Sequence, residues 1–150
     1  MTRVRLVVLT REFASAVVEV VERLPRGRAA DVIGIQLLRS ATSVGANYRA
    51  ACRARSRKEF IAKMGIVEEE ADESDFWLGL LLERGLVDAR LASSLRQRAG
   101  QILAMTVSSI RTARGTPRAT PHSAFRIPHS GSPHSAPRTP HLSASISDVH

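Results

Sequence analysis

Histidine is missing from the first 121 residues, because all five histidines lie at position 122 or later. This absence excludes Ser-His and Cys-His nucleophile pairs there, and also the Glu-x-x-His pairs of di-iron bundles. The chain has one cysteine, Cys52, so no disulfide forms within it, and we expect a reducing compartment and a partly buried structural thiol. Aromatic residues make up only 4%, so the core must be built from Leu, Val, Ile and Ala.

Long apolar runs and glycine-rich loops are also lacking. Near the amino terminus only Leu6–Leu9 forms an apolar run, shorter than the ~7–15 residues of a secretory signal. No stretch approaches the ~20 apolar residues of a membrane span. Gly45 and Gly65 stand inside helical patterns, where close approach of two helices is the natural reason for glycine, and not in a phosphate loop. We therefore expect a cytoplasmic protein with no membrane contact, cofactor or metal.

Positive charge, in contrast, is abundant. Arginine and lysine together number 22 against 14 acids, which gives a formal net charge of +8. Such an excess indicates an anionic partner such as nucleic acid. The alternative interpretation is compositional, because a GC-rich genome raises the arginine content without a functional reason.

The composition changes near Arg114–Gly115. Six of the seven prolines and all the histidines follow, in a segment that repeats Pro-His-Ser. Because proline blocks helices and sheet ladders, we predict a folded domain at 1–114 and a disordered low-complexity tail at 115–150. The histidines His122, His129, His134 and His141 lie 5–7 residues apart without support from Cys or carboxylates, and they fit no preformed metal site.

Residues 1–114 contain one proline, Pro25, and several segments with the 3.6-residue period of an amphipathic helix. The first helix ends at the breakers Pro25 and Gly27, and Val4–Leu9 before it is expected to be a short extended lead-in. The second spans about 29–54. The stripe of the first helix consists of Phe13, Val17, Val20 and Leu24.

The third helix opens with a capping box, Ser56 and Glu59, and Gly85 is its natural stop. Asp88 caps the fourth. The stripe of the third consists of Phe60, Met64, Val67, Ala71, Ser74, Leu78 and Leu81, and that of the fourth includes Leu91, Leu95, Ala99 and Ile102. Four helices joined by short turns predict an all-α fold, an antiparallel up-down four-helix bundle.

Charge is distributed unevenly over these helices. Six carboxylates fall within Glu68–Asp75, whereas 89–114 holds five arginines and no acid. We expect such faces of opposite sign to pair within a subunit or between subunits, and to set register and partner more than stability, because exposed pairs contribute about 0–1 kcal/mol each.

Small and polar residues replace leucine along part of the second helix. Gln36, Ser40, Ser43 and Asn47 recur at spacings of 4, 3 and 4. Small residues let two backbones approach closely, and the amides can then hydrogen-bond across the contact, which costs stability but fixes register. Two interpretations stay open, a seam within one subunit and an interface between subunits.

Five cations follow without an acid among them: Arg49, Arg53, Arg55, Arg57 and Lys58. At the turn between two long helices they form a candidate nucleic-acid-binding surface that would contact phosphates. Tyr48 is the one aromatic residue beside them, so base stacking has little support. A solvated, charged turn is the alternative.

The same region resembles the hallmark of a known family, the four-helix bundle proteins called 23S rRNA-intervening sequence proteins. The pattern, which covers about 13–111, runs through Leu24-Pro25, Gln36, Arg39, Ala41-Thr42-Ser43, Asn47, Arg53–Arg57, Phe60, Glu69, Glu73, Trp77 and Leu78. With Arg39 added from this pattern, the candidate packing or interface set is Gln36, Arg39, Ser40, Ser43 and Asn47. Two departures stand out. Ala50-Ala51 replaces a Glu-Gly pair of many members, and the tail lies outside the pattern.

The resemblance implies a homopentamer without known enzymatic activity. Some members are encoded within insertions in ribosomal RNA genes. The accessory proteins of diversity-generating retroelements are similar in fold and act as basic pentamers on nucleic acid and a reverse transcriptase. We therefore expect a non-enzymatic homo-oligomer that binds RNA or DNA. The alternatives are an interaction scaffold for an unidentified protein partner and, third, an enzyme that uses the third helix's carboxylates with a borrowed metal.

Overall fold

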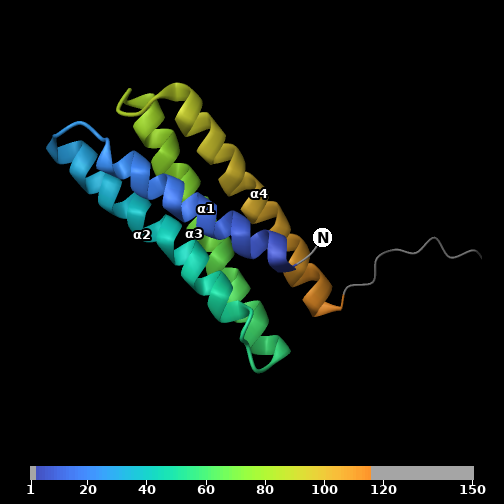
Figure 1. Cartoon of the computed structure of the whole chain (residues 1–150). Helices are drawn as coiled ribbons and strands as arrows, with labels where there is room; N and C mark the ends of the chain where they lie inside the picture. Colours follow the sequence, from blue (N-terminus) through green and yellow to red (C-terminus); the bar gives the residue numbers. More distant parts are fainter. Residues whose placement is uncertain (1–2, 116–150) are drawn as a thin grey trace, which may run out of the picture. The chain divides into compact units, whose positions relative to one another are not determined.

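A computed structural model describes residues 3–115, with side chains from Arg5 onward. Within this range the chain forms four α-helices (Figure 1): α1 (Arg3–Glu22), α2 (Arg28–Ala51), α3 (Arg57–Glu83) and α4 (Ala89–Arg114). The all-α fold is thus confirmed. The predicted tail with its Pro-His-Ser repeats lies outside the described residues, so its disorder and the division into two domains stay predictions.

Successive helices run in opposite directions and pack as neighbours, and α1 also packs against α4 (Figure 1). Individual contacts fix this antiparallel order. A Cβ built on Gly45 of α2 would lie 3.6 Å from the Thr10 carbonyl oxygen of α1, so α1 and α2 approach closely there. Ser40 of α2 meets Ser74 of α3, and Arg57 at the start of α3 reaches the Arg114 carbonyl oxygen at the end of α4. The up-down order follows from these pairs.

The helix ends match the turn chemistry of the sequence. Ser56 accepts a hydrogen bond from the Glu59 N–H at 3.0 Å, and the Glu59 carboxylate accepts from the Arg55 N–H at 2.8 Å, one residue earlier than in the usual capping box. Asp88 caps α4 by accepting from the Leu91 N–H at 2.9 Å. Gly85 has a φ of 65° and follows α3 in a Schellman motif, with Leu86 N–H donating to the Leu81 carbonyl.

The core is mainly aliphatic, as the scarcity of aromatic residues requires, with Phe13 and Tyr48 as its buried aromatic members. The predicted stripe of α3 is buried except for Phe60, which is half-buried and packs against the core. Cys52 is half-buried beside the same core, as expected. None of the described helices combines the length and the apolar character needed to cross a membrane.

Three expectations are corrected. Val4–Leu9 is helical, because Leu6 and Thr10 continue the buried stripe of α1 and so extend its period to the start of the helix. The stripe of α4 begins at Ala92, which is fully buried, while Leu91 is 37% exposed, because Ala92, three residues before Leu95, falls on the same helical face. A Cβ on Gly65 would meet nothing within 4 Å, so no described helix requires glycine there.

The positive φ of Gly85 predicts a stability difference between two Gly→Ala substitutions. Gly85→Ala places a Cβ in the left-handed region and should cost about 1–2 kcal/mol of unfolding free energy. Gly100→Ala lies inside α4 where a Cβ meets no atom, and should stabilise by up to about 1 kcal/mol. Urea unfolding at one protein concentration measures both. Equal effects of the two substitutions would contradict the assignment of this cap.

Candidate functional site

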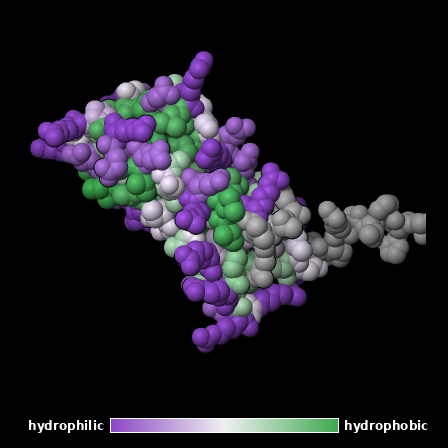
Figure 2. All heavy atoms as spheres, viewed as in Figure 1, coloured by the Kyte–Doolittle hydropathy of each residue, from purple (hydrophilic) through white to green (hydrophobic). Residues whose placement is uncertain are grey.

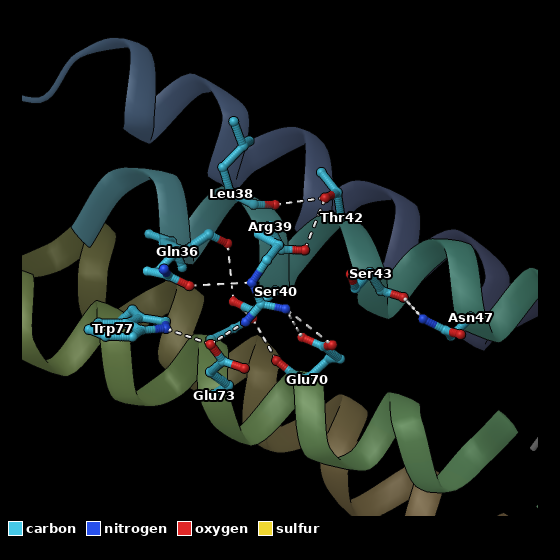
Figure 3. A network of polar contacts seen from close by, with 12 residues as sticks. Gln36, Leu38, Arg39, Ser40, Thr42, Ser43, Asn47, Glu70, Glu73 and Trp77 are labelled. Atoms are coloured by element: carbon cyan, nitrogen blue, oxygen red, sulfur yellow. Dashed lines mark hydrogen bonds and ion pairs between the residues drawn. The ribbon is translucent and has the colours of Figure 1, made fainter. Parts of the chain in front are cut away.

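The polar residues of α2 lie along its contact with α3 (Figure 3). Ser40 is fully buried, and its Oγ lies 2.9 Å from Ser74 Oγ of α3. Each hydroxyl also has a backbone carbonyl of its own helix within hydrogen-bonding distance, at 3.2 Å for Ser40 and 2.8 Å for Ser74. This part of the sequence pattern is a close-packed seam inside one subunit.

The two amides do not cross the seam in the described chain. Gln36 Oε1 accepts a hydrogen bond from Arg39 Nε at 3.3 Å, and Asn47 Nδ2 donates to the Ser43 carbonyl at 3.0 Å. Gln36, Ser43 and Asn47 are half-buried. Each amide thus makes a hydrogen bond within α2, and a role of these three residues in a subunit interface stays a proposal.

Arg39 bridges α2 to two carboxylates of α3 that are one helical turn apart (Figure 3). Its Nη1 lies 3.2 Å from Glu70 Oε2, and its Nη2 donates to Glu73 Oε1. The indole Nε1 of Trp77 donates to the same Glu73 oxygen at 3.0 Å. These contacts tie the exposed edge of α2 to α3.

These hydrogen bonds shift the pKa values of both Glu73 and Arg39 toward the charged forms. The hydrogen bond from Arg39, then that from Trp77, lowers the pKa of Glu73, because both bonds favour the charged carboxylate. The same bond is the main cause that raises the pKa of Arg39. The side chain of Arg39 remains 46% exposed, so solvent screens the attraction and the pair orients the two helices more than it stabilises them.

A second ion pair joins α3 to α4. Arg96 donates from Nε to Asp75 Oδ1 at 2.9 Å and from Nη2 to Asp75 Oδ2 at 3.0 Å, a two-point contact. The guanidinium lies over Gly79 of α3, where a Cβ would be in ordinary van der Waals contact with it, 3.5 Å from Arg96 Cζ. The acidic segment of α3 therefore pairs with arginines of both neighbouring helices within one subunit, which is one of the two expected arrangements.

The basic residues predicted as a binding surface are all exposed at one end of the bundle. In Figure 2, hydrophilic side chains project around the lower end, where the turn between α2 and α3 lies. We call this surface the basic end. Its predicted members, Arg49, Arg53, Arg55, Arg57 and Lys58, are accompanied between positions 49 and 63 by a single acid, Glu59.

Two shallow hollows flank the turn. One, of about 510 Å³, is lined by Ala50, Arg53, Arg55, Glu59 and Lys63. The other, of about 330 Å³, includes Arg55 and Arg57 on its wall. Arg55 lines both, so the turn presents cations on two sides.

Sequence reasoning missed three cations of the basic end. Lys63 lines the larger hollow from the beginning of α3. Arg114 is brought beside Arg57, whose Nη2 lies 3.5 Å from the Arg114 carbonyl oxygen, and Arg111 is one turn earlier on α4. Only the helix lengths could have indicated that the end of α4 lies beside the start of α3. The two antiparallel helices have nearly equal lengths, 27 residues for α3 and 26 for α4.

Metal ligands do not gather in the part of the chain that the structure describes. Between residues 3 and 115, no three residues among His, Cys, Asp and Glu are arranged to hold an ion. The exposed carboxylates of α3 thus form no preformed metal centre there.

The lowered pKa of Glu73 predicts an acid-sensitive contribution to stability. Because its folded pKa lies below the unfolded value, the contribution is present above the ordinary glutamate pKa of ~4.3 and is lost as the pH falls through the lower folded value. Glu73→Gln should therefore lower the urea midpoint slightly at pH 7, and the difference from the unmodified protein should vanish in stronger acid.

Glu69→Gln is the matched control, because Glu69 is an exposed acid on α3 with no hydrogen bond or ion pair among the described side chains. If both substitutions shift the midpoint equally at every pH, the Arg39 contact contributes nothing specific.

Known proteins that are similar to this chain in sequence and structure support the fold described above. A crystal structure from Bacteroides thetaiotaomicron VPI-5482, of a protein of unknown function from the S23 ribosomal protein family, is similar to this chain with a TM-score of 0.67 and 33% sequence identity. The match covers 71% of this chain and 98% of that one. A search of curated proteins found no significant match. The model of the 23S rRNA-intervening sequence protein family matches residues 4–108. The chain therefore belongs to the 23S rRNA-intervening sequence protein family.

Proposed function

We propose that this chain is a non-enzymatic, cytoplasmic homo-oligomer, a pentamer, that binds RNA or DNA through its basic end. The observation that carries the proposal is the exposure of Arg49, Arg53, Arg55, Arg57 and Lys58 around one turn with Glu59 as the single nearby acid. The Glu59 carboxylate is held by the Arg55 N–H, so it caps a helix and leaves the guanidinium groups to solvent. Phosphate oxygens are the anions that such a surface fits best.

Oligomerisation rests on two supports. The family resemblance implies a pentamer, and a slender bundle exposes large apolar side chains that a subunit contact would cover. Ile35 and Val32 on α2 are 65% and 55% exposed, and Phe76 on α3 is 60% exposed. A ring of subunits would repeat the basic end around one rim and so multiply its contacts with a polyanion.

RNA is the first probe to test. The chain's family is named for an intervening sequence of 23S rRNA, and the similar crystal structure is described as a member of a ribosomal protein family. Those descriptions concern the relatives, and for this chain they select the ligand to try first.

The second candidate is a protein-interaction scaffold without nucleic-acid binding. One observation favours it. The ring of Phe76 is exposed beside Trp77, at a centroid distance of 4.8 Å and an interplanar angle of 71°, and exposed aromatic groups of this kind are typical of protein interfaces. In that case the charges of α3 and α4 serve assembly alone.

Salt-titrated binding separates the two candidates. Replacing Arg53, Arg55 and Arg57 together by Ala should strongly weaken the binding of labelled RNA and DNA at ~50 mM salt. Each arginine that neutralises a phosphate releases a counterion, and this favourable contribution to binding is lost with the arginine. The slope of log affinity against log salt should also fall by about one unit per arginine.

The matched control replaces Arg26, Arg84 and Arg90, three exposed arginines at the opposite end of the bundle, by Ala. It removes the same charge and should leave most of the affinity. Absence of binding by the unmodified protein at ~50 mM salt, or an equal decrease in affinity in both triple variants, contradicts the nucleic-acid proposal and favours the scaffold.

Solution mass tests the assembly. Light scattering should give about five times the 16.3 kDa of one chain. A mass of one chain at every concentration would remove both the subunit interface and the repeated rim, whichever ligand the basic end binds.

A further inference from the structure

We infer that the basic end, enlarged by Lys63, Arg111 and Arg114, binds the phosphate backbone of a double helix and does not stack the bases of a single strand. The inference rests on the proposed function and names the class of nucleic acid. It also assigns binding residues that the sequence pattern did not contain. Three observations support it: the source of the positive field, the placement of cations on several helix ends, and the orientation of the nearby aromatic rings.

The positive field at this end comes from side chains. An antiparallel bundle places two helix N-termini and two C-termini at the same end, so the partial charges of the helix dipoles largely offset each other. What remains is the row of arginines and lysines, with Glu59 as the one acid between positions 49 and 63. The surface therefore attracts polyanions through mobile guanidinium and ammonium groups, which suits repeated phosphates better than one buried anion.

These cations belong to three helix ends. Arg53, Arg55 and Lys63 line the larger hollow beside the turn. Arg57 lines the smaller hollow, and its guanidinium reaches the backbone carbonyl of Arg114 at the end of α4. A duplex presents two phosphate backbones on either side of a groove. Cations on two sides of a protruding turn can contact both backbones at once, whereas a single strand would engage one side.

The aromatic rings near this end are largely covered, and only part of Phe60 reaches the surface, in the wall of the smaller hollow. Tyr48 is only 4% exposed, and Phe60 is half-buried and packs against the core. Proteins that bind single strands without sequence preference stack bases on exposed aromatic rings. The described aromatic ring that is most exposed, Phe76, lies on α3 beyond the seam, far along the helix from Arg57. The basic end thus offers many exposed cations but no fully exposed ring on which successive bases could stack.

Arg111 and Arg114 have a structural explanation that the experiment must separate from binding. They stand in the last turn of α4, where cations complement the negative end of the helix dipole. A purely structural role predicts that their removal lowers thermal stability and leaves nucleic-acid affinity unchanged. A binding role predicts the reverse.

The test compares a duplex of about two helical turns, ~20 base pairs, with the single strand of the same length and sequence, in RNA and in DNA. The full chain is titrated with each labelled probe at several salt concentrations. We expect the duplex to bind about tenfold more tightly than the single strand at ~50 mM salt. Arg111→Gln with Arg114→Gln should weaken duplex binding about as much as Arg53→Gln with Lys63→Gln, and each pair should lower the salt slope by about two units.

Arg26→Gln with Arg90→Gln removes two charges at the opposite end and should change neither affinity nor slope appreciably. Circular dichroism melting of every variant reports stability separately. Tighter binding of the single strand, or duplex binding unaffected by the α4 pair while its melting temperature falls, overturns this inference and leaves nucleic-acid binding intact. Absence of binding to all four probes overturns the proposed function as well.

Discussion

The close packing of α2 against α3 is the contact on which the rest of the structure depends. Ser40 and Ser74 are small enough for the two backbones to approach, and their hydroxyls meet at 2.9 Å in a fully buried position. Each hydroxyl also has a carbonyl partner in its own helix, so it is the small size of the two facing residues, more than their mutual hydrogen bond, that holds the register of the helices at this level. A shift of one residue would separate them and would also move Arg39 away from Glu70 and Glu73. The register of α2 against α3 therefore also positions the turn that joins Ala51 to Arg57.

Most of the fold could be predicted from the sequence because its signals are local. Ser56, Gly85 and Asp88 act through hydrogen bonds and a backbone angle within a few residues, so a linear pattern contains them fully. The stripe of α3 was readable for the same reason, since its spacing never breaks. The start of α1 was not, because Thr10 interrupts the apolar pattern, although its hydroxyl is satisfied by the Val7 carbonyl at 3.1 Å and it is buried.

The candidate site was less predictable, because its members meet only after folding. The basic run at the turn is contiguous and therefore visible, whereas Arg114 approaches Arg57 across 57 positions of sequence. The inward orientation of Tyr48 depends on which face of α2 the core selects, and a lone aromatic residue gives no such indication. The partners of the acidic segment were likewise undetermined, since Arg39 and Arg96 approach it from two different helices. Local sequence signals thus predict the helices, whereas tertiary packing determines which charged side chains are paired and which remain exposed to solvent.

Placement of charge bears on the choice between the proposed binding function and compositional bias. A genome that favours arginine adds it wherever the surface tolerates it, and acids then accompany it at random. At the end of the bundle formed by the α1–α2 and α3–α4 turns, arginines do alternate with acids such as Glu22, Asp31, Glu83 and Asp88. In the middle, Arg39 and Arg96 are bound by carboxylates of α3. Among residues 3–115, only around the turn between α2 and α3 do cations of three helix ends gather with one acid, which a helix cap already occupies. Like charges gathered in this way repel one another, although Arg111 and Arg114 also complement the end of α4, and the polyanion proposed above would neutralise them.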